Sequence, residues 1–156
     1  MAGQYAQGTT VDSSASRAEI ERTLVRYGAS SFAYGWQEGS ALIGFTAHGR
    51  QIRFILPMPD RSSRDFTLTP TGRARSERGQ IEAYEQAVRQ RWRALALVVK
   101  AKLEAVASGI VTFDEEFYAH MVLPGGQTVY QATIGAVEYA HETGDVRPLL
   151  QIEAAR

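Results

Sequence analysis

RGQIEAYEQAVRQRWRALALVVKAKLEAVAS, residues 78–108, is the stretch that decides the fold of this chain. Its large apolar residues recur at steps of three and four, which places them on one stripe of an α-helix. They are Ile81, Tyr84, Val88, Trp92, Leu95, Val99, Leu103 and Val106. Good helix formers fill most other positions, and Gly109 follows as a stop signal. We therefore expect one helix of about 30 residues, roughly 45 Å long, on which the other elements pack.

In the middle of this helix, the segment 94–99 (ALALVV) is apolar nearly all the way round. A helix segment that is apolar on every side is usually buried. We expect the centre of the helix to be covered on more than one side.

The composition describes one soluble domain with an apolar core. The chain has 156 residues, of which 44% are apolar, and its 17 basic and 17 acidic residues give a pI near 6.8. The absence of cysteine excludes disulfides, thiol nucleophiles and cysteine-bound metals, and it is typical of a reducing cytoplasm. No signal peptide and no apolar run of membrane-spanning length is present, so we expect a cytoplasmic protein with no membrane partner.

The charges are unevenly placed along the chain. Residues 50–102 contain twelve basic and five acidic residues, a net charge of +7, whereas residues 103–156 contain two basic and eight acidic residues, a net charge of −6. One interpretation is a phosphate-binding region next to an acidic one. The other is that the two regions attract each other within the fold or across an oligomer.

The N-terminal part predicts a helix followed by a small sheet. We expect residues 1–15 to form a flexible arm and residues 16–156 to form a single α+β domain, whose first helix begins at Ser16 and ends before Gly28. Three strand-like runs follow with short loops between them, which predicts a three-stranded antiparallel meander. They are residues 31–36, 41–46 and 51–56.

The C-terminal part predicts helices. Residues 58–76 form a long polar loop in which Phe66 and Leu68 suggest a short strand returning to the sheet. Beyond the long helix, two shorter helices are expected. A capping-box pattern at Thr112 marks the start of the first, and Thr128 caps the second. The fold class is therefore α+β: an N-terminal helix, a three-stranded antiparallel meander, one long central helix and two shorter C-terminal helices.

No motif for catalysis, metal binding or cofactor binding is present. Glu116 and His120 lie four residues apart, but a metal site needs three or four ligands, and no second cluster supplies them. The acidic run 114–116 is explained by its place at a helix N-terminus. We expect a protein that is not an enzyme and has no cofactor and no metal.

Aromatic residues on the first strand suggest a base-stacking platform. Phe32, Tyr34 and Trp36 alternate with small residues and share one face of the strand. The alternative is that these rings form the core beneath the long helix.

Basic residues give the strongest functional signal. They follow the long loop and the flanks of the long helix, where they could contact a phosphate backbone. They are Arg61, Arg64, Arg73, Arg75, Arg78, Arg89, Arg93 and Lys100. The alternative is an ordinary solvated helix face.

One long stretch resembles an uncharacterised family of small proteins encoded by tailed bacteriophages and prophages. It is residues 89–129, RQRWRALALVVKAKLEAVASGIVTFDEEFYAHMVLPGGQTV. The stretches SRAEIERTLVRYGASSFAYGW and GRQIRFILPMP resemble the same family, so the likeness extends from Ser16 to Val129. The resemblance implies a protein made in the bacterial cytoplasm, and it brings no catalytic residues.

Two functional hypotheses follow. The first is a non-enzymatic accessory protein of phage DNA replication or recombination, which binds nucleic acid, most simply single-stranded DNA, through its basic residues. The second is an anti-defence inhibitor that binds a host protein or sequesters a phosphorylated nucleotide. An uncovered edge of a three-stranded sheet would also favour a homo-oligomer.

Overall fold

The computed structural model describes the backbone of residues 3–150 and the side chains of residues 13–150. The elements follow the order α1 (Gly3–Arg26), β1 (Ser31–Gln37), β2 (Ser40–Ala47), β3 (Arg50–Pro57), α2 (Arg64–Thr67), α3 (Glu77–Ala107), α4 (Phe113–Phe117), the 3-10 helix η1 (Tyr118–His120) and α5 (Val129–Thr143). The predicted α+β class is confirmed: an N-terminal helix, a three-stranded antiparallel sheet, a long central helix and shorter C-terminal helices.

The three strands form a meander in the order β1-β2-β3, and both pairs are antiparallel. The loop between β2 and β3 is only His48 and Gly49, which have φ angles of 51° and 71°. Positive φ at both positions is the signature of the hairpin turn whose twist matches that of the strands. This turn fixes the register, in which Ile43 lies opposite both Tyr34 and Phe54.

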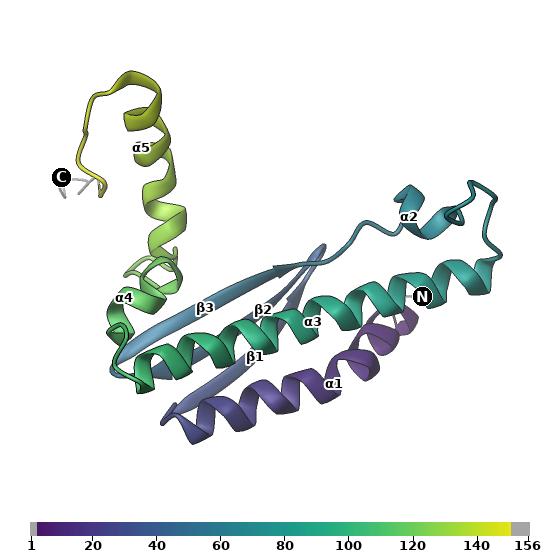
Figure 1. Cartoon of the computed structure of the whole chain (residues 1–156), viewed down its shortest axis with the longest axis horizontal. Coiled ribbons are helices and arrows are strands. Elements are labelled where there is room, and N and C mark those ends of the chain that lie inside the picture. Colours follow the sequence, from purple (N-terminus) through teal and green to yellow (C-terminus); the bar gives the residue numbers. More distant parts are fainter. Residues whose placement is uncertain (1–2, 151–156) are drawn as a thin grey trace.

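Helices α1 and α3 lie side by side along one face of the sheet (Figure 1). The alternate residues of β2 and β3 that face these helices are buried, and so is the apolar stripe of α3. The core consists mainly of Ile20, Leu24, Ile43, Phe45, Ile52, Phe54, Val88, Trp92, Val99, Leu103 and Phe117. Burial of each large side chain stabilises the fold by about 1.5–3 kcal/mol, and Trp92, which is fully buried, lies at the centre.

Helix α3 begins where the sequence predicts, because Ser76 accepts a hydrogen bond from the N–H of Gly79 and so caps the first turn. The prediction that its middle is covered on more than one side is wrong within the described residues. Leu97 is 59% exposed and Val98 is 44% exposed. Only the face toward the sheet and α1 is covered, so α3 keeps an apolar outer face.

The N-terminal helix starts earlier than predicted. Helix α1 begins at Gly3, so most of the segment expected as a flexible arm, residues 1–15, is helical, while residues 1–2 lie outside the described part. Ser13 is already fully buried. Because α1 packs along α3, tertiary contact outweighs the local capping signal at Ser16.

Two details of the chain beyond the sheet also differ from the sequence prediction. Phe66 does not form a strand that returns to the sheet, because it belongs to α2, and Leu68 forms an isolated bridge with Ala74. The helix that begins after Thr112 ends at Phe117 and continues as η1. Met121 then pairs with Ile52 and extends the edge of β3.

Candidate nucleic-acid interface

The loop between β3 and α3, residues 58–76, is an ordered structure that we call the arm. Ser63 caps α2 by accepting a hydrogen bond from the N–H of Asp65 at 3.3 Å. The chain then turns back on itself: the N–H of Thr69 donates to the carbonyl of Arg73 at 2.7 Å, and the N–H of Arg75 donates to the carbonyl of Thr67 at 2.8 Å. The arm therefore presents Arg64 from a capped helical turn and Arg73 and Arg75 from a small hydrogen-bonded hairpin.

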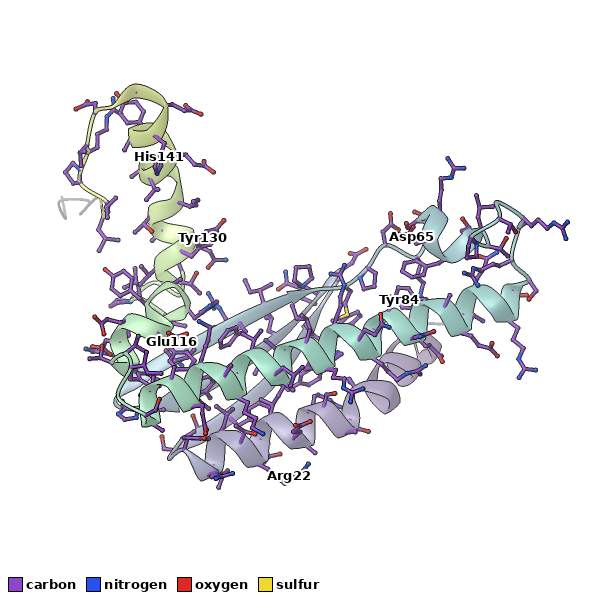
Figure 2. The ribbon with its side chains drawn as sticks, in the orientation of Figure 1. Arg22, Asp65, Tyr84, Glu116, Tyr130 and His141 are labelled. Carbon is purple, nitrogen blue, oxygen red and sulfur yellow. The ribbon has the colours of Figure 1, made fainter. Side chains whose placement is uncertain are left out.

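One aromatic contact attaches the arm to α3. Phe66 is 8% exposed, and its ring lies edge-on to that of Tyr84, with 5.5 Å between the ring centroids. The guanidinium of Arg61 lies 4.3 Å from the centroid of the same Tyr84 ring. Figure 2 shows Asp65 and Tyr84 at this junction between the arm and the helix. A cation held against an aromatic face is partly desolvated, so Arg61 supports the junction and is less accessible than Arg64 and Arg73.

The remaining arm arginines have different environments. Arg64 and Arg73 are exposed, and within the described side chains neither forms an ion pair. Arg75 is half-buried and its Nε donates to the carbonyl of Leu68 at 2.8 Å, which fixes the direction of the guanidinium. The Nε of Arg78 lies 2.9 Å from a carboxylate oxygen of Glu82, so its charge is locally balanced.

Three adjoining depressions connect the arm to the flank of α3. The first, about 360 Å³, is lined by Arg64 and Arg75; the second, about 640 Å³, by Arg75 and Arg89; the third, about 330 Å³, by Arg89 and Arg93. Because each neighbouring pair of depressions shares one arginine, the four residues form a continuous row. We call Arg64, Arg75, Arg89 and Arg93 the basic track.

The track has polar partners that the sequence interpretation missed. Gln86 and Gln90 line both the second and the third depression. Their spacing with the arginines, at steps of three and four, is the local signal that places all of them on one face of α3. Two carboxylates also line the track, those of Asp65 and Glu82, and Glu82 is paired with Arg78.

Not all of the predicted phosphate-binding residues belong to this row. Lys100 lies on the same flank of α3 as Arg93, two helical turns further on, and lines none of the three depressions. Arg61, Arg73 and Arg78 lie in or next to the arm but likewise line none of these depressions. The structure thus divides the predicted set into a connected row of four and four separate residues.

Asp114 and Glu116, two acidic residues of α4, pair with basic residues outside the track. Arg50 pairs with Asp114 at 3.0 Å and Lys102 pairs with Glu116 at 2.8 Å, both near α4. The hydrogen bond from Arg50 holds the pKa of the Asp114 carboxyl below its usual range. Helix α5 and the following residues lie at the opposite end of the molecule from the arm (Figure 1).

The proposed stacking platform on β1 is wrong for two of its three residues. Phe32 and Tyr34 face the helix layer and pack against the core. The ring of Tyr34 lies 5.6 Å from that of Trp92, and the guanidinium of Arg17 lies 4.4 Å from its centroid. Trp36, near the end of the strand, is 43% exposed. The alternative, that these rings belong to the core, is confirmed for Phe32 and Tyr34.

Glu116 and His120 do not come together as a metal pair. Glu116 binds Lys102, and the ring of His120 stacks on Phe54 with 4.1 Å between centroids. Throughout the described residues there is no group of three or more His, Cys, Asp or Glu that could hold a metal ion. In the same part of the chain, no helix is long and apolar enough to cross a membrane.

Comparison with known proteins found no matching family model, no similar curated protein and no similar solved structure. The ligand proposed for this site is therefore inferred from the geometry and charge of the site.

Proposed function

We propose that this protein binds single-stranded nucleic acid without catalysing a reaction, as an accessory protein of phage or prophage DNA metabolism in the bacterial cytoplasm. The observation that carries the proposal is the basic track, in which four arginines line three connected depressions. Guanidinium groups suit phosphate because each offers several N–H donors in a planar fork. The phage assignment rests on the resemblance of residues 16–129 to a phage family.

The polar lining of the track favours a single strand. The amides of Gln86 and Gln90 both donate and accept hydrogen bonds, so they can bind base edges that duplex pairing would hide. A groove of cations that follows the phosphate backbone binds with little sequence preference.

A small-molecule ligand is the second candidate. The depression between Arg75 and Arg89 measures about 640 Å³, within the size range of small-ligand sites, and would suit a phosphorylated nucleotide. This reading corresponds to a nucleotide-sequestering anti-defence protein.

Fluorescence anisotropy with a labelled oligothymidine at low ionic strength tests the proposal. The variant Arg64→Glu/Arg93→Glu should lower the affinity about a hundredfold, since each charged hydrogen bond contributes about 1.5 kcal/mol or more. The matched control Arg22→Glu/Arg26→Glu changes the net charge equally on α1 and should bind nearly normally; Figure 2 shows Arg22 well away from the arm. Equal losses in both variants would refute a defined track. Displacement of the oligonucleotide by a mononucleotide at micromolar concentration would favour the second candidate.

A further inference from the structure

Helix α5 stands away from the two-layer domain (Figure 1). Its packing partner within the domain is mainly η1, and the segment after α5 folds back along one of its sides. That side carries Ala132, Gly135, Ala136 and Tyr139, which face Pro148 and Leu149 across an open depression.

A different side of α5 carries a second apolar stripe. Tyr130, Ile134 and Val137 follow at steps of four and three, which places them on one face of the helix. Tyr130 is 57% exposed, and Ile134 and Val137 are half-buried. None of the three lines the depression shared with the returning segment. Glu138 borders this stripe and forms no ion pair among the described side chains.

Helix α3 has a matching stripe on its outer face. Leu97 and Val98 are 59% and 44% exposed, and Ala94 and Ala101 extend the same face by one turn in each direction. Small residues at both ends let another helix approach closely. Lys100 borders this stripe, and it too has no ion pair in the described part of the chain.

We propose that the stripe Tyr130–Ile134–Val137 of one copy packs on the outer face of α3 of a second copy. The two stripes have the same length, because each extends over eight residues, a rise of about 10.5 Å from the first residue to the last. Their borders carry opposite charges, Glu138 on α5 and Lys100 on α3. The contact also explains why residues 94–99 of α3 are apolar nearly all the way round. The second copy covers the side of this segment that its own domain leaves exposed.

This contact joins two different surfaces, the α5 stripe and the outer face of α3, and every copy has both of them. Such a contact produces a reciprocal pair, a closed ring or an open chain of copies, depending on the rotation between neighbours. The inference does not depend on the proposed function, because Lys100 is outside the basic track and none of the apolar stripe residues lines it.

Light scattering coupled to gel filtration tests the contact in the full chain. The wild type should have a mass above that of one chain, and both Leu97→Glu and Val137→Glu should be monomeric. Val25→Glu is the matched control, since Val25 is an apolar residue on α1 that is 65% exposed, and it should not change the mass. Circular dichroism checks that each variant keeps its helix content.

Mixing the two monomeric variants gives the sharpest result. The Leu97→Glu chain keeps a normal α5 and the Val137→Glu chain keeps a normal α3 face, so the mixture should form a species of two chains. A monomeric wild type, a loss of assembly in only one of the two variants, or no association on mixing would each overturn the proposal.

The bordering charges provide an independent check. Lys100→Glu and Glu138→Lys should each weaken assembly, because each places two like charges at the contact. The two changes in the same chain should restore it. If the double variant assembles no better than either single variant, the proposed contact is wrong.

Discussion

Replacing Phe66 with alanine should release the arm from α3 without unfolding the two-layer domain. Phe66 is the buried residue of α2, and its ring lies against that of Tyr84. The other contacts within the arm are hydrogen bonds between its own residues, such as that of Arg75 with the carbonyl of Leu68. The arm also contacts α3 through Arg61, which lies over the Tyr84 ring, and through the side-chain amide of Gln80, which donates to the carbonyl of Arg75 at 3.2 Å, but Phe66 is the buried apolar side chain of this attachment.

The size of the effect follows from the burial of this ring. Truncation of a buried phenylalanine to alanine costs about 3–5 kcal/mol, and part of this loss comes from the edge-on contact with Tyr84. Because Phe66 lies at the margin of the core, we use the lower value. A loss of about 3 kcal/mol corresponds to about two orders of magnitude in the equilibrium between the attached and released arm.

Amide hydrogen exchange measures this equilibrium directly. The N–H groups of Thr69 and Arg75, which donate within the arm, should exchange about a hundredfold faster in Phe66→Ala and should be much less protected than the N–H of Trp92 in α3, which opens only with the whole domain. Phe113→Ala, which removes a buried ring at the other end of α3, should leave the two arm amides unchanged. Arm amides that remain as protected as the N–H of Trp92 in Phe66→Ala would refute the reasoning. The same variant should bind nucleic acid more weakly although all its arginines remain.

Two further predictions concern the C-terminal half. Burial and the nearby charge of Lys102 hold the pKa of His120 below its ordinary value. On acidification, the imidazole is therefore protonated at a higher pH in the unfolded chain than in the folded chain. The free energy of unfolding should therefore decrease as the pH falls through about 6.5, and His120→Gln should reduce this dependence in urea titrations at several pH values. Thr128→Ala removes the side-chain oxygen that accepts from the N–H of Gln131 at 3.2 Å. It should destabilise α5 by about 1 kcal/mol, seen as faster exchange of that amide, whereas Thr128→Ser should behave like the wild type.

Elements with a local signal could be predicted from the sequence. The steps of three and four from Tyr84 to Leu103 define α3, and Ser76 caps it, so its limits agree with the prediction to within one residue. The strands were found because short loops separate alternating runs, and one loop, His48-Gly49, has the two positive φ angles of a tight hairpin. These signals lie within a few residues of the elements that they define.

Elements that depend on tertiary contact were missed. Helix α1 extends to Gly3 because it packs along α3, while a local capping pattern at Ser16 suggested a later start. Phe66 is helical because its ring packs on Tyr84, eighteen residues further along the chain. No local pattern encodes either contact.

The candidate site divides in the same way. Arg89 and Arg93 share a helix face by spacing alone, so the sequence could place them together. Their connection to Arg64 and Arg75 depends on how the arm folds against α3, which only the structure shows. For Tyr34, the sequence correctly predicts that large and small side chains alternate along β1. It does not show which face of the sheet the helices cover, and Tyr34 lies on that covered face.

The dependence of nucleic-acid affinity on salt tests the central claim most directly. Four arginines that each neutralise one phosphate of a single strand predict a slope of about −2.8 for the logarithm of the association constant against the logarithm of the salt concentration. Arg64→Ala/Arg93→Ala should reduce this slope to about −1.4. A slope near zero for the wild type, or the same slope in the variant, would contradict binding through the basic track.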